Sequence, residues 1–276
     1  MSAPDFETTH EIFKAECSQN ANRAWNDEAL KQKTNDWLVH TCLYKYSYNF
    51  TWLGRPVIQY PQDVVAMQEL IWKTKPDLVI ETGIAHGGSL ILSASMLALI
   101  DYAEAVQCGS SIDPKASPRR VLGVDIDIRA NNRAAIEAHP LAHKITMIQG
   151  SSIDPTVIAQ VHKYARNHSR ILVCLDSNHT HDHVLAELEG YAPLTSRNSY
   201  CVVFDTVVDD MPSDMFPDRP WGKGNNPKTA VHEYLKRVAA ERRQAFDGET
   251  LQFAIDKSIE HKLLLTVAPD GYLRRI

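Results

Sequence analysis

The side chains best suited to chemistry follow two apolar runs of the sequence. Asp176 and His179, three residues apart, come directly after one run, and Asp205 ends the next. Two carboxylates at neighbouring strand ends would repel each other unless they shared a hard cation such as Mg2+. A neutral imidazole, with a reference pKa of about 6.5, could take the proton of an attacking hydroxyl. We therefore predict Asp176 and Asp205 as metal ligands and His179, with Asp176, as catalytic.

Structural roles remain open for these side chains. Either aspartate could cap a helix or stand in a solvated turn. His181 and His183 begin the next helical segment and are predicted to be capping or surface groups. Histidines at two-residue spacing also suit a transition metal, but no cysteine completes a tetrahedral set.

Glycines gather where an apolar run gives way to a helical segment. The turn reads Glu81-Thr82-Gly83-Ile84-Ala85-His86-Gly87-Gly88-Ser89. Such a turn lets backbone approach a ligand and directs helix N-terminal amides at it. The G-x-G-x-x-G spacing is absent, and an acid before the turn would repel a pyrophosphate. S-adenosylmethionine, which is cationic and phosphate-free, suits Glu81 better, and the predicted contacts are Glu81, Gly83, His86, Gly87 and Ser89.

The ends of the next two apolar runs extend this cofactor site. Asp125 ends one run and could hold a ribose diol through two hydrogen bonds. Ser152 and Asp154 follow the other and could border an adenine ring, and Asp176 would reach the cofactor from the far side. Together these turns are typical of a methyltransferase, although an α/β domain whose turns merely favour Gly and Asp would look similar.

Buried strands must position these turns. Short, almost continuously apolar runs alternate with helical segments, which is typical of strands covered on both faces. The predicted strands are 78–80, 121–124, 145–148, 171–175, 200–204 and 263–267, and the predicted helices are 87–101, 129–138, 155–167, 182–190 and 228–243. This alternation predicts an α/β fold with a doubly wound, mostly parallel, Rossmann-like sheet.

Two segments depart from this alternation. Residues 1–60 predict an N-terminal helical extension, with an aromatic stretch at 44–52, that covers the site or builds an oligomer contact. Residues 61–276 form the predicted cofactor-binding domain. Within it, the Pro-, Gly- and Asn-rich loop 206–228 is predicted to be a lid, because long loops in compact domains are usually functional.

Composition excludes several functional classes. The chain has 276 residues and a formal net charge of -5, so it lacks the basic field that holds nucleic acid. The apolar stretch 91–100 is about half as long as a membrane span. The acidic first twenty residues do not resemble a signal peptide, so a cytoplasmic location is expected. The five scattered cysteines predict free thiols, buried where they lie in core strands.

Four stretches carry a family resemblance that covers most of the chain. They are 48–56, 81–89, 175–179 and 218–227, the last reading Asp-Arg-Pro-Trp-Gly-Lys-Gly-Asn-Asn-Pro. The chain resembles the cephalosporin hydroxylase/rhamnosyl O-methyltransferase family. The resemblance implies a class I S-adenosylmethionine-dependent O-methyltransferase that acts on a hydroxyl of a sugar or glycosylated natural product, often with Mg2+ and often as a homo-oligomer. It implies Asp176 as metal ligand and His179 as general base.

One position departs from the family pattern. Relatives carry a Glu-Asp pair at the end of the fifth strand, whereas this chain has Phe204 and Asp205. The metal requirement is therefore open, with Asp209 and Asp210 as the remaining nearby acids. Substrate orientation would then depend more on the lid, because displacement at a methyl group requires alignment. The candidate substrate residues are Arg219, Trp221, Lys223 and Asn225.

Two other classes remain as alternatives. A non-haem iron hydroxylase needs two histidines and one carboxylate, and none of the 12 histidines is followed two positions later by an acid. A non-catalytic protein that binds S-adenosylmethionine or a nucleoside is the second alternative, and Phe204 is the argument for it.

Overall fold

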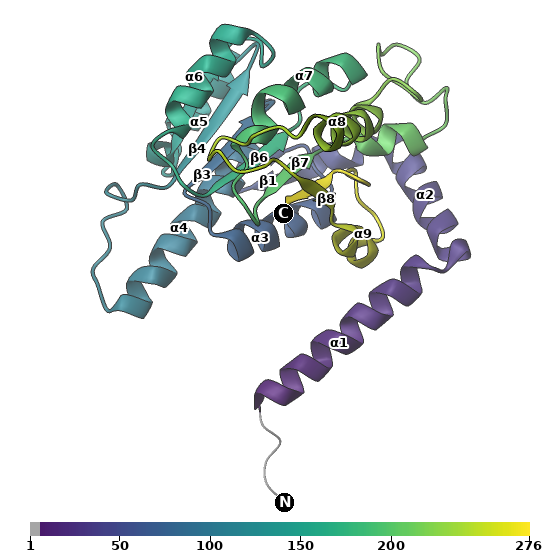
Figure 1. Cartoon of the computed structure of the whole chain (residues 1–276), viewed down its shortest axis with the longest axis horizontal. Coiled ribbons are helices and arrows are strands. Elements are labelled where there is room, and N and C mark those ends of the chain that lie inside the picture. Colours follow the sequence, from purple (N-terminus) through teal and green to yellow (C-terminus); the bar gives the residue numbers. More distant parts are fainter. Residues whose placement is uncertain (1–5) are drawn as a thin grey trace, which may run out of the picture.

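The chain folds round a mixed seven-stranded sheet (Figure 1). The computed structural model describes residues 6–276, with side chains from residue 9 onward. The order across the sheet is β5-β4-β3-β6-β7-β9-β8, with β9 antiparallel to both neighbours and the other pairs parallel. The strands are β3 (Leu78–Thr82), β4 (Arg120–Asp125), β5 (Ile145–Gln149), β6 (Ile171–Leu175), β7 (Tyr200–Val203), β8 (Phe253–Ile255) and β9 (Tyr272–Arg275). The predicted doubly wound, mostly parallel sheet is confirmed.

Strand order places a crevice between β3 and β6. The chain passes outward from β3 to β4 and β5, then crosses back to β6 on the other side of β3. The connections after β3 and β6 therefore diverge, which opens a crevice at the carboxyl ends of these two strands. The glycine turn follows β3 and Asp176 follows β6, and residues of both line one hollow.

Helices cover both faces of the sheet. One buried core contains side chains of α3, α4 and α5, together with α2 (Glu28–Leu43) and α9, and the other contains α6, α7 and α8. The bounds are α3 (Pro61–Thr74), α4 (Gly88–Cys108), α5 (Ala130–Glu137), α6 (Pro155–Ala165), α7 (His181–Tyr191), α8 (Pro227–Glu241) and α9 (Lys257–Leu263). Short 3-10 turns, η2 (Ala142–Lys144), η3 (Ala192–Leu194) and η4 (Thr206–Asp210), join them. The five helices predicted from the sequence are confirmed within a few residues, except that α4 continues to Cys108.

The central strands are fully enclosed. Every residue of β3, β6 and β7 is buried, which explains why their sequences are almost continuously apolar. Cys174 and Cys201 are buried free thiols on β6 and β7, as predicted, whereas Cys17 and Cys108 are exposed.

Helix α4 has the length and composition of a membrane span. Its 21 residues exceed the stretch 91–100 that was considered from the sequence. Half of its apolar window is buried inside the protein, against β4 and α3. A core helix of this length meets the same criteria, and α4 is such a helix.

The predicted strand at 263–267 is wrong. Residue Leu263 ends α9, Leu264 turns the chain at a positive φ of 59°, and the following residues form an irregular buried segment. Leu265 and Val267 pack into the core. Apolar residues inside an irregular buried segment resemble a buried strand by composition, and periodicity cannot separate them.

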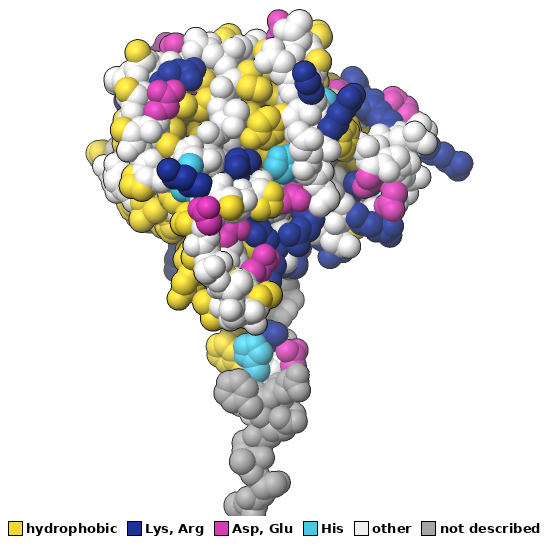
Figure 2. All heavy atoms as spheres, turned by 90° about the vertical axis from the view of Figure 1, so that its left-hand side faces the viewer, with side chains coloured by type: hydrophobic (Ala, Val, Ile, Leu, Met, Phe, Trp, Pro, Cys, Tyr) yellow, Lys and Arg dark blue, Asp and Glu magenta, His cyan; other side chains and the backbone are white. Residues whose placement is uncertain are grey.

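The N-terminal segment is partly helical, as predicted. It comprises α1 (Phe6–Trp25), α2 (Glu28–Leu43), the turn η1 (Tyr46–Asn49) and a hairpin of β1 (Phe50–Trp52) and β2 (Arg55–Val57). Helix α1 projects from the body (Figures 1 and 2). It contacts the body at α9, where Trp25 stacks on His261 with ring centroids 4.9 Å apart. The first five residues of the predicted extension lie outside the described residues.

A buried carboxyl group fastens the irregular segment to α3. Asp63 is fully buried, and its Oδ1 accepts hydrogen bonds from Thr266 Oγ1 at 2.5 Å and Tyr272 OH at 2.9 Å. Its Oδ2 accepts from the Val267 amide at 3.1 Å. Burial raises the pKa of Asp63 to about 6, although these donors oppose the shift.

We expect Asp63→Asn to change the pH dependence of stability. The folded-state pKa, about 6, lies above the reference value of 3.8, so the stabilisation from protonation is complete below 3.8 and is lost as the pH rises through 6. Relative to the variant, the wild type should therefore lose up to about 3 kcal/mol of unfolding free energy over this range. Urea unfolding of both proteins from pH 4 to 7 measures it, and a pH-independent difference would contradict the assignment.

Candidate active site

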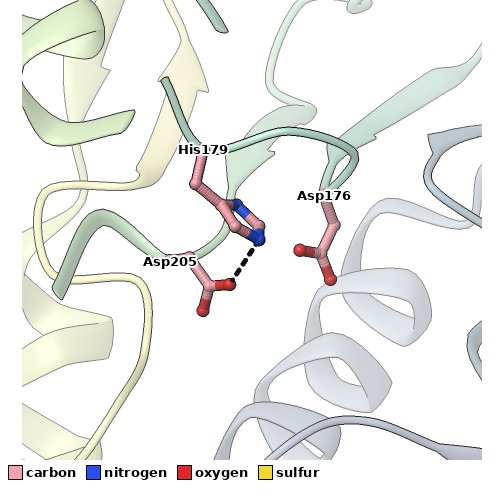
Figure 3. A group of neighbouring side chains, drawn as sticks. All are labelled: Asp176, His179 and Asp205. Atoms are coloured by element: carbon pink, nitrogen blue, oxygen red, sulfur yellow. Dashed lines mark ion pairs between the residues drawn. The ribbon is translucent and has the colours of Figure 1, made fainter. Parts of the chain in front are cut away.

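Asp176, His179 and Asp205 converge at the carboxyl edge of β6 and β7. Their ligand atoms all lie within 4.8 Å of one another, and His179 Nε2 is 3.1 Å from Asp205 Oδ2 (Figure 3). The two strands are parallel neighbours, so the predicted pairing of the two aspartates is present. Asp205 sits at a positive φ of 55°, where the chain turns from β7 into η4.

Three carboxyl groups crowd this part of the crevice. Asp176 lines one hollow together with Glu81 and Phe204. Burial raises the pKa of Asp176 well above its usual range, and the nearby carboxyl groups of Asp205 and Glu81 raise it further. Among the described residues, no lysine or arginine pairs with any of the three carboxyl groups. In the part of the chain that the structure describes, the one basic side chain that pairs with them is His179, which contacts Asp205.

The donor set suits a hard divalent cation. Two carboxylates and water would satisfy Mg2+, which prefers oxygen ligands. One histidine with two aspartates does not match the two histidines and one carboxylate of an iron hydroxylase. Asp209 and Asp210 do not join the cluster in the described chain. Asp209 accepts from the Gly224 amide and Asn226, and Asp210 pairs with Lys228.

The glycine turn lies directly against the chemistry segment. Gly83 has a φ of 89°, and a Cβ on it would lie 2.0 Å from the carbonyl oxygen of Asp176. Gly87 has a φ of 81° and is packed against Ile136, and a Cβ on Gly88 would lie 2.2 Å from the Pro56 carbonyl oxygen. The backbone thus approaches both β6 and the N-terminal hairpin, as only glycine allows.

Glu81 lines the same hollow as Asp176. It is buried, and Ser89 Oγ donates a hydrogen bond to it. Burial raises the pKa of Glu81 to about 8, the Ser89 hydrogen bond opposes this, and Asp125 adds to it. A cationic ligand beside this carboxyl group would restore its charge.

The other predicted cofactor residues have partners of their own. Asp125 Oδ2 accepts from the Ile84 and Ala85 amides at 2.8 and 3.2 Å, so it braces the glycine turn. Ser152 is buried, with its hydroxyl 3.0 Å from His183 Nε2. Asp154 caps α6 by accepting from the Thr156 amide at 2.7 Å. This capping role is the structural alternative to adenine contact for Asp154.

Three residues near the crevice were missed by sequence reasoning. Gln59 Nε2 donates to Asp176 Oδ2 at 2.9 Å, and Arg55 holds the His86 carbonyl through Nε at 3.0 Å. Ile126, directly after Asp125, is 71% exposed. Gln59 and Arg55 lie in the N-terminal region, far in sequence from their partners, so no local pattern marks them. For Ile126, the available signal was an apolar residue between Asp125, the predicted ribose-binding acid, and Asp127.

The predicted lid partly covers His179. The Trp221 ring meets the His179 ring edge-on, with centroids 4.8 Å apart, and the Arg219 guanidinium lies 5.2 Å from the Trp221 centroid. Asn225 anchors the loop, since its Oδ1 accepts from the His181 amide at 2.9 Å and its Nδ2 donates to the Pro220 carbonyl. Lys223 is exposed. Of the predicted substrate residues, Trp221 therefore contacts His179, Arg219 lies against Trp221, and Asn225 holds the loop in place.

His181 and His183 are partly buried and have side-chain partners, so they are not the capping or surface groups that the sequence predicted. His181 Nδ1 is 2.8 Å from Thr229 Oγ1 and its Nε2 is 3.1 Å from Glu233, which ties α7 to α8. His183 lies among Ser152, Ser177 and the buried Glu187. Neither belongs to the cluster of Figure 3.

Sequence comparison assigns the family. The sequence model of the rhamnosyl O-methyltransferase/CmcI family matches residues 44–276. The chain belongs to this family. It is therefore an S-adenosylmethionine-dependent O-methyltransferase, and the resemblance read from its motifs is confirmed.

Individual members of the family are distant relatives. Rhamnosyl O-methyltransferase of Mycobacterium tuberculosis (strain H37Rv) is 28% identical over 229 residues, which is 82% of this chain and 78% of the relative. The Mycobacterium leprae protein of the same name is 27% identical over 226 residues, 82% of each chain. The solved structure of CmcI with Mg2+ and S-adenosylmethionine has a TM-score of 0.50 at 17% identity, over 83% of this chain and 77% of that one, and supports the fold.

We expect Gly83→Ala to lower the stability of this family member by more than backbone strain alone would. A matched control is Gly54→Ala, because Gly54 has a φ of 87° against 89° for Gly83 but no atom within 4 Å of an added Cβ. The control should cost about 1–2 kcal/mol for left-handed backbone. Gly83→Ala should cost clearly more and weaken S-adenosylhomocysteine binding at least about ten-fold, because the clash displaces the Asp176 segment. Urea unfolding and calorimetry measure both, and equal costs would contradict the close approach.

Proposed function

We propose that this enzyme transfers the methyl group of S-adenosylmethionine to a hydroxyl group of a sugar or glycosylated natural product, with His179 as general base. The observation that carries the proposal is the placement of His179, which lies between Asp205 and Trp221 at the crevice beside Asp176. The names of the mycobacterial relatives support a sugar hydroxyl as acceptor.

The crevice suits the cofactor from end to end. Glu81 and Asp176 offer negative charge to the ammonium and sulfonium groups, and the amides at the N-terminus of α4 suit the carboxylate. Asp125 would bind the ribose while it braces the glycine turn. Ile126 and Ile153, exposed after β4 and β5, would enclose the adenine together with Ser152.

His179 would accept the proton of the acceptor hydroxyl. As that proton leaves, the oxygen attacks the methyl carbon, the carbon–sulfur bond breaks, and the cofactor becomes the neutral thioether S-adenosylhomocysteine. The imidazolium that forms is stabilised by the Asp205 carboxylate, 3.1 Å from Nε2. The lid pair Arg219 and Trp221 would exclude water and orient the sugar, because in-line displacement depends on alignment.

Asp176 and Asp205 would hold Mg2+ if the reaction uses it. A bound divalent cation lowers the pKa of an attached hydroxyl group. Phe204 takes the place of the glutamate that the family resemblance implies, and its ring is buried in the core. This substitution also favours the second candidate function, binding of S-adenosylmethionine without turnover. Calorimetry followed by a methyl-transfer assay separates the two.

The N-terminal segment would contribute residues to the crevice and a contact surface for a homo-oligomer. Residues 1–60 form the proposed extension to the domain 61–276, whose lid is 206–228. The hairpin and the segment before α3 supply Arg55 and Gln59 to the crevice. On the projecting helix α1, Ile12 and Phe13 are 64% and 61% exposed, which suits a contact in a homo-oligomer.

We expect His179→Ala to impair chemistry and spare cofactor binding. Turnover should fall by roughly 10² to 10⁴, the usual range for a general base, while S-adenosylhomocysteine affinity stays within a few-fold. Turnover is measured with p-nitrophenyl rhamnoside as acceptor, and affinity by calorimetry. His232→Ala is the control, because His232 also pairs with a carboxylate, Asp270 at 2.9 Å, but lies outside the crevice. Unchanged turnover in His179→Ala would remove this residue from the mechanism.

We expect EDTA to reduce activity only partly. With Phe204 in place of a carboxylate, two aspartates bind a cation more weakly and alignment by the lid carries more of the rate. Relatives with two adjacent acids should lose more activity under the same conditions. The assay compares initial rates before and after chelation and after Mg2+ is restored. Complete loss that Mg2+ reverses would show a third ligand, for which His179 is the nearest candidate.

A further inference from the structure

Gln59 lies at the centre of the crevice. It belongs to the short segment between β2 and α3 and lines two adjoining hollows. Gly83 lines one hollow and Glu81 lines the other, while Ser89 and Asp176 line both. The general base mechanism leaves this side chain without a role.

The two ends of the Gln59 amide have different surroundings. Nε2 donates to Asp176 Oδ2 at 2.9 Å. Oε1 is buried and has no hydrogen-bond partner among the residues that the structure describes. When Asp176 is ionised, as a bound cation favours, the reverse amide orientation would place an acceptor oxygen against a carboxylate oxygen, so the ionised Asp176 fixes which atom remains free. A buried carbonyl oxygen without a donor is costly, and a ligand that donates would remove that cost.

The chemistry of the crevice indicates which donor arrives. Its acidic groups, Glu81, Asp176 and Asp205, favour a cation, and a carbonyl oxygen adds an acceptor suited to an ammonium N–H. S-adenosylmethionine carries one such group, on its methionine portion. We propose that Gln59 Oε1 accepts a hydrogen bond from the cofactor ammonium group while Nε2 holds Asp176, so that one side chain joins the cofactor to the acid cluster. The inference rests on the proposed cofactor site.

The chain offers a matched control one turn further on. Gln62 Oε1 is also buried without a partner in the described structure, but Gln62 lines neither hollow. Loss of the Gln62 amide should therefore leave cofactor binding unchanged.

The experiment is a cycle of protein and ligand changes followed by calorimetry. The proteins are the wild type, Gln59→Met, Gln59→Asn and Gln62→Met. The ligands are S-adenosylhomocysteine, its analogue in which 4-thiobutanoate replaces homocysteine and so removes only the amino group, and 5′-methylthioadenosine. We expect Gln59→Met to weaken S-adenosylhomocysteine about ten-fold or more and the desamino analogue less than two-fold. In Gln59→Asn the side chain is too short to reach the ammonium group, so this variant should behave like Gln59→Met. Gln62→Met should bind all ligands like the wild type.

The other outcomes separate the possible failures. Unchanged 5′-methylthioadenosine binding shows that the adenosine end of the site is intact in each variant. Equal weakening of S-adenosylhomocysteine and its desamino analogue in the Gln59 variants would overturn the ammonium assignment, as would no weakening of either. Failure of the wild type to bind S-adenosylhomocysteine would instead overturn the proposed function itself.

Discussion

Repulsion among three carboxyl groups is the constraint on which the site depends. Asp176, Asp205 and Glu81 share a partly buried crevice, and no lysine or arginine of the described chain pairs with them. In low dielectric such a group favours protonation, which is the direction of the Asp176 and Glu81 pKa shifts. Every other feature of the crevice bears on this charge. Ser89, Gln59 and His179 each give one carboxyl group a donor.

Close backbone packing keeps the three groups together. The Asp176 amide donates to the Thr82 carbonyl at 3.0 Å, and Asp125 binds the amides that follow Gly83, so hydrogen bonds tie the turn after β3 to the ends of both β4 and β6. Asp205 enters from β7 at a positive φ, which turns its side chain back toward His179. Bringing the three carboxyl groups together costs electrostatic free energy, and positive charge bound in the crevice would offset this cost.

Sequence reasoning found what strand order dictates and missed what distant segments add. Because carboxyl ends of parallel strands share one edge, the runs at 171–175 and 200–204 sufficed to pair Asp176 with Asp205. Gln59 was invisible, because its partner lies 117 residues further along the chain and no local pattern encodes such a contact. The run 263–267 misled because burial, which its composition reports, is not the same as strand conformation. Asp154 fitted a cap as well as an adenine contact, and the local sequence could not choose.

The charges in the crevice offer a physical reason why position 204 can hold a phenylalanine and not a glutamate. The three carboxylates carry three negative charges when ionised. A divalent cation brings two positive charges, and S-adenosylmethionine brings a net one, because its ammonium and carboxylate cancel and its sulfonium remains. With both bound, the crevice is neutral. A glutamate at 204, which the family resemblance implies for relatives, would add a fourth negative charge, whereas a phenyl ring adds none and packs into the core at 6% exposure. In the proposed reaction, sulfur loses its positive charge with the methyl group, and the proton of the acceptor hydroxyl gives an equal positive charge to His179.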